Sequence, residues 1–554
     1  MILIGETMTG IELFIKTLQH WGVPYISTLC GYGLDPLDDA CHKNSLRLVD
    51  VRNEQAAAYM ADAYGRLTGT PGVCAVSSGV AHVNALSGVL NAYFDGAPML
   101  LITGSGDTTT MGMGHFQDLD HVALAKPICK YARLIDRVRL IPEILYEAWS
   151  IAINGRPGPV HITFPQDIMK AEIGDISIKQ IPSPPERLVT SPDPLQIAEV
   201  AQIMKESQQP LIVAGSGVFY SQGESALLHL AREQAIPIVT PIWDRGSISE
   251  PASAFMGVIG AATGGVTFLN EADVLIMAGV APDYRVGYLQ SPSIRSDARV
   301  IRIDGDSTQL HRTGRGDLFV SGDIRLTLES IINACHTSGR HPTSDWLESA
   351  RIRQDAFRQQ CIAARDFAAS GLHALDIIDA IKTILTDETI VVMDGGNIGQ
   401  WCHQVLCDKY PGQWLTSGTS GVVGYGLPAA MTARLLYPES PIILISGDGS
   451  LTFTIAEFET ASRQNLGFAV VLADDESWGI TLTGHTKTFG QGITSELGPI
   501  QFDQVAQGFG AHGLRIQDAQ DIAPAISEAM NGDKPTLIHV PVVRSSPVDG
   551  EDNR

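Results

Sequence analysis

Residues 442–480 read IILISGDGSLTFTIAEFETASRQNLGFAVVLADDESWGI, and the interpretation of the whole chain starts from this stretch. The apolar run at 442–445 predicts a buried parallel strand, which ends in a glycine turn carrying Asp448. A segment with helical periodicity follows, and its inward residues are expected to be Phe453, Ile455, Phe458 and Ala461. A second apolar run at 468–472 ends in the pair Asp474–Asp475. The stretch therefore predicts a strand–turn–helix–strand unit with an acid after each strand, at the sheet edge where open parallel sheets bind ligands.

The residue types in this unit suit a site for a metal ion and a diphosphate. Glycines let the backbone approach phosphate closely, and the start of a helix offers free N–H groups. The carboxylates of Asp448 and Asp475 suit a hard cation such as Mg2+ that bridges to phosphate oxygens. Gly-Asp-Gly also forms ordinary turns, so a purely structural turn stays open on spacing alone.

The block resembles the thiamine-diphosphate motif of the acetolactate synthase, benzoylformate decarboxylase and benzaldehyde lyase group. In that motif Gly-Asp-Gly is followed, some two dozen residues later, by Asn-Asn; here Asp475 lies 27 residues after Asp448. The resemblance implies that Asp448, the side chain of Asp475 and the carbonyl of Ser477 hold the metal, and that Gly449 and Ser450 contact the cofactor. Asp-Asp replaces Asn-Asn, and the added charge could strengthen the hold on the metal or weaken the hold on the cofactor.

Strand and helix signals alternate along most of the chain, which predicts parallel α/β structure. With 554 residues, several domains are expected. A linker rich in proline and serine at 181–194 and a charged, helical connector at 340–365 mark the boundaries. We expect three doubly wound, mostly parallel sheets flanked by helices: an N-terminal pyrimidine-binding domain at 1–175, a central domain at 190–340 and a C-terminal diphosphate and magnesium domain at 366–545.

Glu54 is the first candidate catalytic residue. A glutamate in the first helical turn commonly serves the helix dipole. However, RNEQAAAYMADAYGRLTG at 52–69 resembles the family's Arg-His-Glu-x-x-Ala stretch, in which the glutamate hydrogen-bonds the aminopyrimidine ring and activates the cofactor. A dry pocket would raise the pKa of such a carboxyl, so that it can share a proton near neutral pH.

The loop at 112–118 resembles the Phe-Gln stretch of acetolactate synthase. The resemblance implies that Gln117 donates to an alkoxide forming on the substrate, although a loop glutamine facing water is the alternative. His115 is a second acid–base candidate in this loop. Gly31 and Ser78, each after a predicted strand, are assigned to the cofactor; relatives often carry a histidine near Gly31, which is absent here.

Further cofactor contacts are implied in the last domain. Gly395, Gly396 and Asn397 would cradle the diphosphate, and the carbonyl of Gly421 would accept from the 4′-amino group. Val423 would be the apolar wedge that bends the cofactor. Ile480 stands where relatives tune pocket size, in a segment at 478–489 that is expected to be a helical, mobile cover.

The sequence of the central domain leaves open whether this domain binds a flavin. Gly215-Ser216-Gly217 follows a predicted strand, and a second strand ends at Asp304, as in a nucleotide site. Acetolactate synthase holds FAD in its equivalent domain, and Met256-Gly257 and Asp283 lie in stretches that resemble it. The arginine that opens the family's Arg-Phe-Asp-Asp-Arg is Ala281 here, so FAD and a purely structural domain both remain possible.

Composition narrows the partners. A net charge of −23 without a basic cluster argues against nucleic acid and anionic membrane. The eight cysteines form no CxxC pair, which gives zinc and redox motifs little support. The first residues do not read as a secretory signal, and no apolar stretch is long enough to span a bilayer. We expect a cytoplasmic enzyme with small-molecule substrates.

The resemblance implies a carboligase or lyase, similar to acetolactate synthase, that uses thiamine diphosphate and Mg2+ on 2-keto acids or 2-hydroxy ketones. Ser417 and Gly399 stand where benzaldehyde lyase has a histidine and a tyrosine, so the pocket is poor in proton donors. Carbon–carbon bond chemistry is therefore favoured over protonation to a free aldehyde. The alternatives are a non-oxidative 2-keto acid decarboxylase and a non-catalytic relative. Because Glu54 and the metal site come from different subunits in this family, a homodimer or homotetramer is expected.

Overall fold

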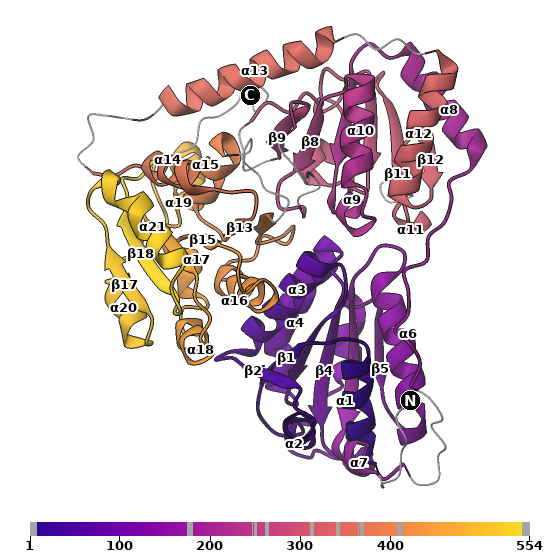
Figure 1. The fold of residues 1–554 in the computed structure, drawn as a ribbon, viewed down its shortest axis with the longest axis vertical. Coiled ribbons are helices and arrows are strands. Elements are labelled where there is room, and N and C mark those ends of the chain that lie inside the picture. The colour runs from indigo at the N-terminus through magenta and orange to yellow at the C-terminus, as the bar shows by residue number, and fades with distance from the viewer. Residues whose placement is uncertain are drawn as a thin grey trace. The chain divides into compact units, whose positions relative to one another are not determined.

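A computed structural model of the chain describes residues 8–173, 181–245, 248, 252–260, 265–310, 315–339, 344–363, 365, 371–406 and 414–545 (Figure 1). Within them lie three six-stranded sheets in which every pairing between strands is parallel. By contacts the chain forms two compact units. The first comprises Met1–Leu188 with Met431–Leu436, and the second Val189–Ala430 with Tyr437–Arg554. Three α/β domains, each built on a parallel sheet with helices, confirm the predicted fold class; their exact boundaries stay a prediction.

The first sheet has the strand order β2-β1-β3-β4-β6-β5. Its strands are β1 (Tyr25–Leu29), β2 (Arg47–Asp50), β3 (Gly72–Val76), β4 (Met99–Ser105), β5 (Tyr131–Leu134) and β6 (Pro159–Pro165). Its helices are α1 (Gly10–His20), α2 (Asp35–Lys43), α3 (Glu54–Thr68), α4 (Val80–Asp95), α5 (His121–Ala125), α6 (Ile141–Ile153) and α7 (Gln166–Lys170). Alternate strand residues such as Ile26, Ala75 and Ile162 pack with α1 and α6 in one core cluster. Helices α3 and α4 pack against each other (Figure 1).

The central sheet has the order β12-β11-β10-β7-β8-β9. Its strands are β7 (Pro210–Ala214), β8 (Ile238–Pro241), β9 (Phe255–Ile259), β10 (Val274–Ala278), β11 (Arg299–Asp304) and β12 (Leu318–Ser321). The helices around it are α8 (Pro194–Glu206), α9 (Ser216–Tyr220), α10 (Glu224–Gln234), α11 (Ser307–Leu310) and α12 (Ile324–Ser338). The connector that follows contains α13 (Asp345–Ala363), so it is helical as the sequence predicted.

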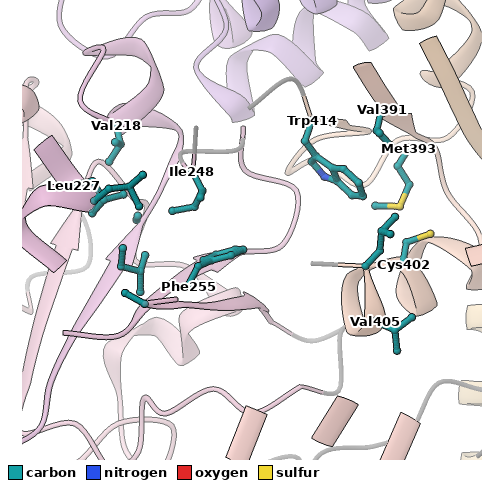
Figure 2. Close-up of a cluster of buried hydrophobic side chains, with 14 of the residues drawn as sticks. Val218, Leu227, Ile248, Phe255, Val391, Met393, Cys402, Val405 and Trp414 are labelled. Carbon is teal, nitrogen blue, oxygen red and sulfur yellow. The ribbon is translucent and has the colours of Figure 1, made fainter. Parts of the chain in front are cut away.

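The third sheet has the order β14-β13-β15-β16-β18-β17. Its strands are β13 (Ile390–Met393), β14 (Trp414–Thr416), β15 (Ile442–Gly447), β16 (Ala469–Asp474), β17 (His512–Arg515) and β18 (Thr536–Pro541). Its helices are α14 (Ala374–Ile384), α15 (Asn397–Val405), α16 (Gly426–Leu436), α17 (Asp448–Thr452), α18 (Glu457–Arg463), α19 (Gly479–Phe489), α20 (Phe502–Gly508) and α21 (Ile522–Met530). Figure 2 shows part of the large core cluster of the second unit, with Val218, Leu227 and Phe255 from the central sheet and its helices and Val391, Cys402 and Trp414 from the third sheet and its helices.

The predicted helix over 453–461 is wrong in its first half. Helix α17 ends at Thr452 and α18 begins at Glu457, with a turn between them. The hydroxyl of Thr454 donates to the carbonyl of Gly424 (2.8 Å), which ties this turn to the glycine loop beside it. Phe453, expected inside, is consequently 52% exposed, whereas Phe458 and Ala461 are fully buried as expected.

Among the described residues, no helix combines the length and the apolar character that crossing a bilayer requires.

Candidate active site

The two acids of the Gly-Asp-Gly block come together at the carboxyl end of the third sheet. Strands β15 and β16 are paired in register through Gly447 and Ala473, so the turns after them are adjacent. The backbone N–H of Ser477 donates to Asp448 Oδ2 (3.1 Å), and its hydroxyl donates to Asp475 Oδ1 (2.7 Å). Ser477 thus links the carboxylate that follows β15 to the carboxylate that follows β16.

This cluster concentrates negative charge in a buried place. Burial, and then the nearby carboxylates of Asp475 and Asp474, raise the pKa of Asp448 to about 7. Burial also raises the pKa of Asp475. Carboxylates that resist ionisation because they face one another are stabilised by a cation. The two carboxylates and the carbonyl of Ser477 are oxygen ligands suited to Mg2+. Among the described residues, no group of three or more His, Cys, Asp or Glu side chains could hold a metal ion, so such an ion would also need ligands from phosphate or water.

Asp474, the other member of the Asp-Asp pair, faces a different partner. Its Oδ2 lies 2.7 Å from Nε2 of His539, which is fully buried on β18, and its Oδ1 accepts from the N–H of Glu476 (3.2 Å). The pair is therefore divided, with one acid directed at Asp448 and the other at a histidine. The sequence analysis did not identify His539, although a histidine inside the apolar strand 536–541 was a visible signal.

A glycine cradle adjoins the acids. A Cβ added to Gly395 would lie 2.9 Å from Val423 Cγ1. Gly396 has φ +113°, and a Cβ added to it would lie 2.9 Å from the Cα of Gly447. Helix α15 begins at Asn397 with no side-chain cap. Asn397 Nδ2 donates to Asp475 Oδ2 (3.4 Å), while its buried Oδ1 has no partner among the described residues. Free backbone N–H groups at the start of a helix, and glycines that let a ligand come close to the backbone, are suited to binding an anionic diphosphate.

Asp394 orders the loop that faces this cradle. Its carboxylate accepts from the backbone N–H groups of Gly395 (2.8 Å), Gly424 (3.2 Å) and Gly426 (3.0 Å). Burial raises its pKa to about 6, and the three donors oppose that rise. The loop carries Gly421, in the left-handed region at φ +68°. Asp394 was not among the site residues predicted from the sequence.

A cavity of about 280 Å3 runs along these elements. Most of the residues predicted to bind the cofactor and metal line it, namely Gly395, Gly396, Gly421, Val423, Asp448, Gly449, Ser450, Ser477 and Ile480. Asn397 and Asp475 line a smaller adjoining cavity, which shares Gly396, Asp448 and Ser477 with the first. His403, which the sequence analysis did not identify, also lines the large cavity, and burial lowers its pKa to about 3.

In the first unit, Glu54 is the first residue of α3, and its side chain is half-buried. Its Oε2 accepts from Asn84 Nδ2 on α4 (3.0 Å), which orients the carboxyl. Gly31 follows β1 and packs closely on Ser77, since an added Cβ would lie 2.6 Å from the Ser77 hydroxyl.

Gln117 and Ser78 lie together at the start of α4. Ser78 Oγ donates to the carbonyl of Gln117 (3.0 Å), and Gln117 holds a left-handed backbone at φ +56°. Its amide oxygen is buried, without a partner among the described residues. His115 has both ring nitrogens engaged, Nε2 with Asp118 Oδ1 (3.2 Å) and Nδ1 with the carbonyl of Phe116 (2.9 Å). Proton transfer through His115 would therefore require these contacts to break.

Behind this loop lie three buried histidines that the sequence analysis missed. His121 Nε2 accepts from the N–H of Gly79 (3.0 Å), and the His82 ring is 4.9 Å from the His121 ring and 4.8 Å from that of His161. The Thr103 hydroxyl lies 2.8 Å from His82 Nδ1 and 3.0 Å from His161 Nε2. Burial lowers the pKa of all three imidazoles, to about 3 for His82 and about 4 for His121, and so keeps them neutral.

The described part of the central domain does not fit a flavin at its glycine turn. Asp244 Oδ2 accepts from the N–H of Ser216 (3.2 Å) and would lie 2.7 Å from a Cβ on Gly215. An internal carboxylate thus takes the turn N–H that a dinucleotide phosphate would use. Arg285 lies 2.6 Å from this carboxylate and balances its charge, so it is the occupied N–H that argues against a phosphate at this turn.

Comparison with known families matches three sequence profiles to the chain. The profile described as "Thiamine pyrophosphate enzyme, N-terminal TPP binding domain" matches residues 8–124, the central-domain profile matches 197–331, and the C-terminal TPP binding profile matches 394–540. Each match contains most of one of the three sheets.

Individual proteins are similar along nearly their whole length. A probable acetolactate synthase large subunit of Methanococcus aeolicus is 30% identical, over 97% of this chain and 93% of the relative. The acetolactate synthase isozyme 1 large subunit of Escherichia coli is 28% identical, over 97% and 94%. The 2-hydroxyacyl-CoA lyase 2 of Caenorhabditis elegans is 26% identical, over 96% and 89%.

Proposed function

The chain belongs to the thiamine pyrophosphate enzyme family, and we propose that it forms or cleaves carbon–carbon bonds next to the carbonyl of 2-keto acids or 2-hydroxy ketones. The relatives support both directions, since acetolactate synthases and a 2-hydroxyacyl-CoA lyase are similar to it over nearly the full chain. The observation that carries the proposal is the cavity at the end of the third sheet, which is lined both by Asp448, the proposed cation ligand, and by apolar residues such as Val423 and Ile480.

The residues present fit thiamine diphosphate with Mg2+. Asp448, Asp475 and the carbonyl of Ser477 would hold the cation. The buried Asn397 Oδ1, which has no hydrogen-bond partner among the described residues, would be available to a polar group beside it. The diphosphate would take the N–H groups of the cradle and of Gly449 and Ser450. Gly421 and Val423 would meet the rings. When bound, the cofactor supplies a stabilised carbanion equivalent at the carbonyl carbon of the substrate.

In this proposal, the residues of the first unit manage protons and charge. Glu54 would exchange a proton with the pyrimidine ring of a bound cofactor, and Asn84 would hold the carboxyl in place for this role. Gln117 directs its amide at the substrate carbonyl and stabilises the oxygen as negative charge develops there. The left-handed backbone of Gln117, tied to Ser78, presents that amide in a fixed position.

The cavity favours bond formation over simple decarboxylation, because its described lining offers few groups that donate a proton at physiological pH. His403 is the single histidine among the described lining residues, and with a pKa of about 3 it is neutral at physiological pH. Ser417 and Gly399 line the same cavity and carry no acidic proton. These residues would be slow to protonate the reacting carbon, which would favour its addition to a second carbonyl.

We also propose that the active unit contains at least two copies, with Glu54 of one copy serving the cavity of the other. The Glu54 carboxyl is half-buried, and α4 exposes Val80 (64%) and Val83 (48%) beside Asn84. Apolar residues exposed next to a functional carboxyl are typical of a surface that another subunit covers.

Product analysis tests the function. Purified protein is incubated with pyruvate, thiamine diphosphate and Mg2+, with and without an aldehyde acceptor, and separately with 2-hydroxy ketones. We expect acetolactate, acetoin or a mixed hydroxy ketone as the main product, or an aldehyde from the hydroxy ketones. Acetaldehyde as the dominant product from pyruvate would point to a decarboxylase, and absence of any turnover would point to a non-catalytic relative.

A further inference from the structure

The loop after β8 contains a bulky residue in a strained backbone conformation. Trp243 has φ +70°, in the left-handed region that large side chains rarely adopt. Such strain persists only where the surrounding contacts over-determine the backbone, and it is concentrated at functional sites. Trp243 is half-exposed, so its conformation is not explained by packing in the core.

Hydrogen bonds to buried groups hold Ile242 and Asp244, the residues before and after Trp243. On one side, the N–H of Ile242 donates to the carbonyl of Ile259 (2.7 Å), and the Ile242 carbonyl accepts from Arg285 Nη1 (2.7 Å). On the other side, Asp244 accepts from the same guanidinium (2.6 Å) and from the N–H of Ser216 (3.2 Å). These bonds fix the chain before and after the tryptophan and hold it in the strained form.

Arg245 joins this loop to the third sheet. Its N–H donates to Ser216 Oγ (2.8 Å), and its buried Nη1 donates to the carbonyl of Trp414 (2.9 Å), at the start of β14. Ile242 and Trp243 accordingly line the same cavity as Thr416 and Ser417, at the end of β14.

The strand order gives the position of Trp243 relative to the acids. Strand β14 is separated from β15, which Asp448 follows, by β13. Two strand spacings amount to about 10 Å. Because Arg245 is bonded to β14, we place Trp243 on the β14 side of the cavity, away from the strand that Asp448 follows. Thr416 and Ser417, at the end of β14, carry no charge, so this side forms an uncharged flank.

We propose that Trp243 is a specificity-determining residue, whose indole closes this uncharged flank and limits the apolar group that the substrate carries on its reacting carbonyl. The inference rests on the proposed function and names its substrate class, namely 2-keto acids or hydroxy ketones with a small alkyl substituent. The cavity of about 280 Å3 must also take part of the cofactor, which leaves little room for an aryl group.

The test compares holoenzymes loaded with thiamine diphosphate and Mg2+. The substitution Trp243→Gly removes the indole and suits the left-handed backbone, and Trp243→Phe shortens the wall without opening it. Tyr288→Gly is the matched control, because Tyr288 is also an exposed aromatic residue at positive φ (+53°) in the central domain, but it does not line the cavity. Thermal unfolding verifies that each variant is folded.

The measured quantity is the ratio of kcat/KM for benzoylformate to that for pyruvate. We expect Trp243→Gly to raise this ratio by at least about tenfold, Trp243→Phe to raise it less, and Tyr288→Gly to leave it at the wild-type value. A ratio that stays within about twofold of the wild type in both Trp243 variants, or that falls, would overturn the proposal.

A binding measurement separates this failure from failure of the proposed function. Calorimetric titration with the methyl esters of acetylphosphonate and benzoylphosphonate, which mimic the two keto acids, reports the same ratio without turnover. A wild-type holoenzyme that neither converts nor binds any of these compounds would overturn both proposals. Binding or turnover with an unchanged ratio would overturn only the role of Trp243.

Discussion

At the scale of single residues, the arrangement of three aspartates is the main departure from the family motif. Asp474 is engaged by His539, whereas Asp475 shares Ser477 with Asp448, so the charge added next to the cation site comes mainly from Asp475. Because burial and these neighbours raise the pKa of Asp448 to about 7, a proton would compete with the proposed cation below that pH.

The substitution Asp475→Asn should change the pH dependence of cation binding. Removing the nearer negative charge lowers the pKa of Asp448, so that affinity for Mg2+ in the presence of thiamine diphosphate persists to a pH about one unit lower. Calorimetric titrations between pH 5.5 and 8 measure the midpoint of the pH range over which the affinity for Mg2+ is lost. Asp474→Asn is the control and should produce a smaller shift, because His539 already pairs with Asp474. A midpoint that moves upward in Asp475→Asn would contradict this account.

The substitution Glu54→Gln should abolish most activity while leaving cofactor loading nearly intact. The amide keeps the shape of the side chain but cannot accept the proton, which costs about 10²–10⁴-fold in kcat. Turnover and the dissociation constant for thiamine diphosphate are measured on the same preparation. Glu143→Gln is the matched control, since Glu143 lies in the first turn of α6 and is exposed. Wild-type turnover in Glu54→Gln would refute the proposed mechanism.

At the scale of elements, the strands and their ends could be predicted, and the turns between them only in part. Apolar runs bounded by glycine and aspartate located β15 and β16 and their acids, because buried parallel strands require such runs. The division between α17 and α18 could not be predicted, since it depends on a bond from Thr454 to Gly424, thirty positions earlier. The strained backbone of Trp243 could not be predicted for the same reason, because the residues that hold it are distant in sequence.

The three buried histidines of the first unit should make its stability depend on acidity. Their pKa values lie below the ordinary value of 6.5 in the folded chain, so unfolding takes up protons as pH falls below 6.5, and stability is lost down to about pH 4. His82→Leu should flatten the decline by at most about 1.4 kcal/mol per pH unit. Thr103 keeps its bond to His161 in this variant.

Denaturant unfolding of wild type and His82→Leu from pH 7 to pH 4.5 measures this difference. Buried acids with raised pKa, such as Asp62, act in the opposite direction but cancel in the comparison. His42→Leu, at an exposed position of α2, is the matched control. Parallel pH profiles for the wild type and His82→Leu would show that the imidazole of His82 takes up no proton when the protein unfolds, and would contradict this account.

The glycine turn after β7 should keep the central domain free of flavin. Asp244 accepts the N–H of Ser216 and so occupies the donor that a phosphate at that turn would need. We expect protein purified without added cofactor to lack the visible absorbance of a flavin, and dialysis against FAD not to introduce it. A yellow preparation that retains stoichiometric FAD would contradict this interpretation of Asp244.

At the scale of the whole molecule, the sequence indicated three domains but could not place Glu54 relative to Asp448. These residues belong to different compact units of the chain, and pairing of copies is set by surfaces rather than by motifs. The exposed valines of α4 became recognisable as a candidate surface only after the helix was folded, because their exposure depends on which side α3 covers.

Mixing two inactive variants tests whether copies share sites. If Glu54 serves the partner copy, a Glu54→Gln chain paired with an Asp448→Ala chain forms one site with both defects and one intact site. Random reassociation after mild dissociation should then restore roughly one quarter of wild-type activity, because half of the pairs are mixed and each has one working site. Mixing each variant with itself is the control. No recovery, with mixed pairs demonstrated by mass spectrometry, would place both residues in one chain.

The contact between Gly396 and Gly447 has a practical consequence for altering this protein. A Cβ on Gly396 would lie 2.9 Å from the Gly447 Cα, and one on Gly447 would lie 3.0 Å from the Gly396 Cα, so any side chain at either position displaces backbone. Mutant libraries aimed at new substrates should therefore leave this pair untouched. Codon randomisation is better directed at Val422, Ile480 and Trp243, whose side chains line the hollow without supporting the strand ends.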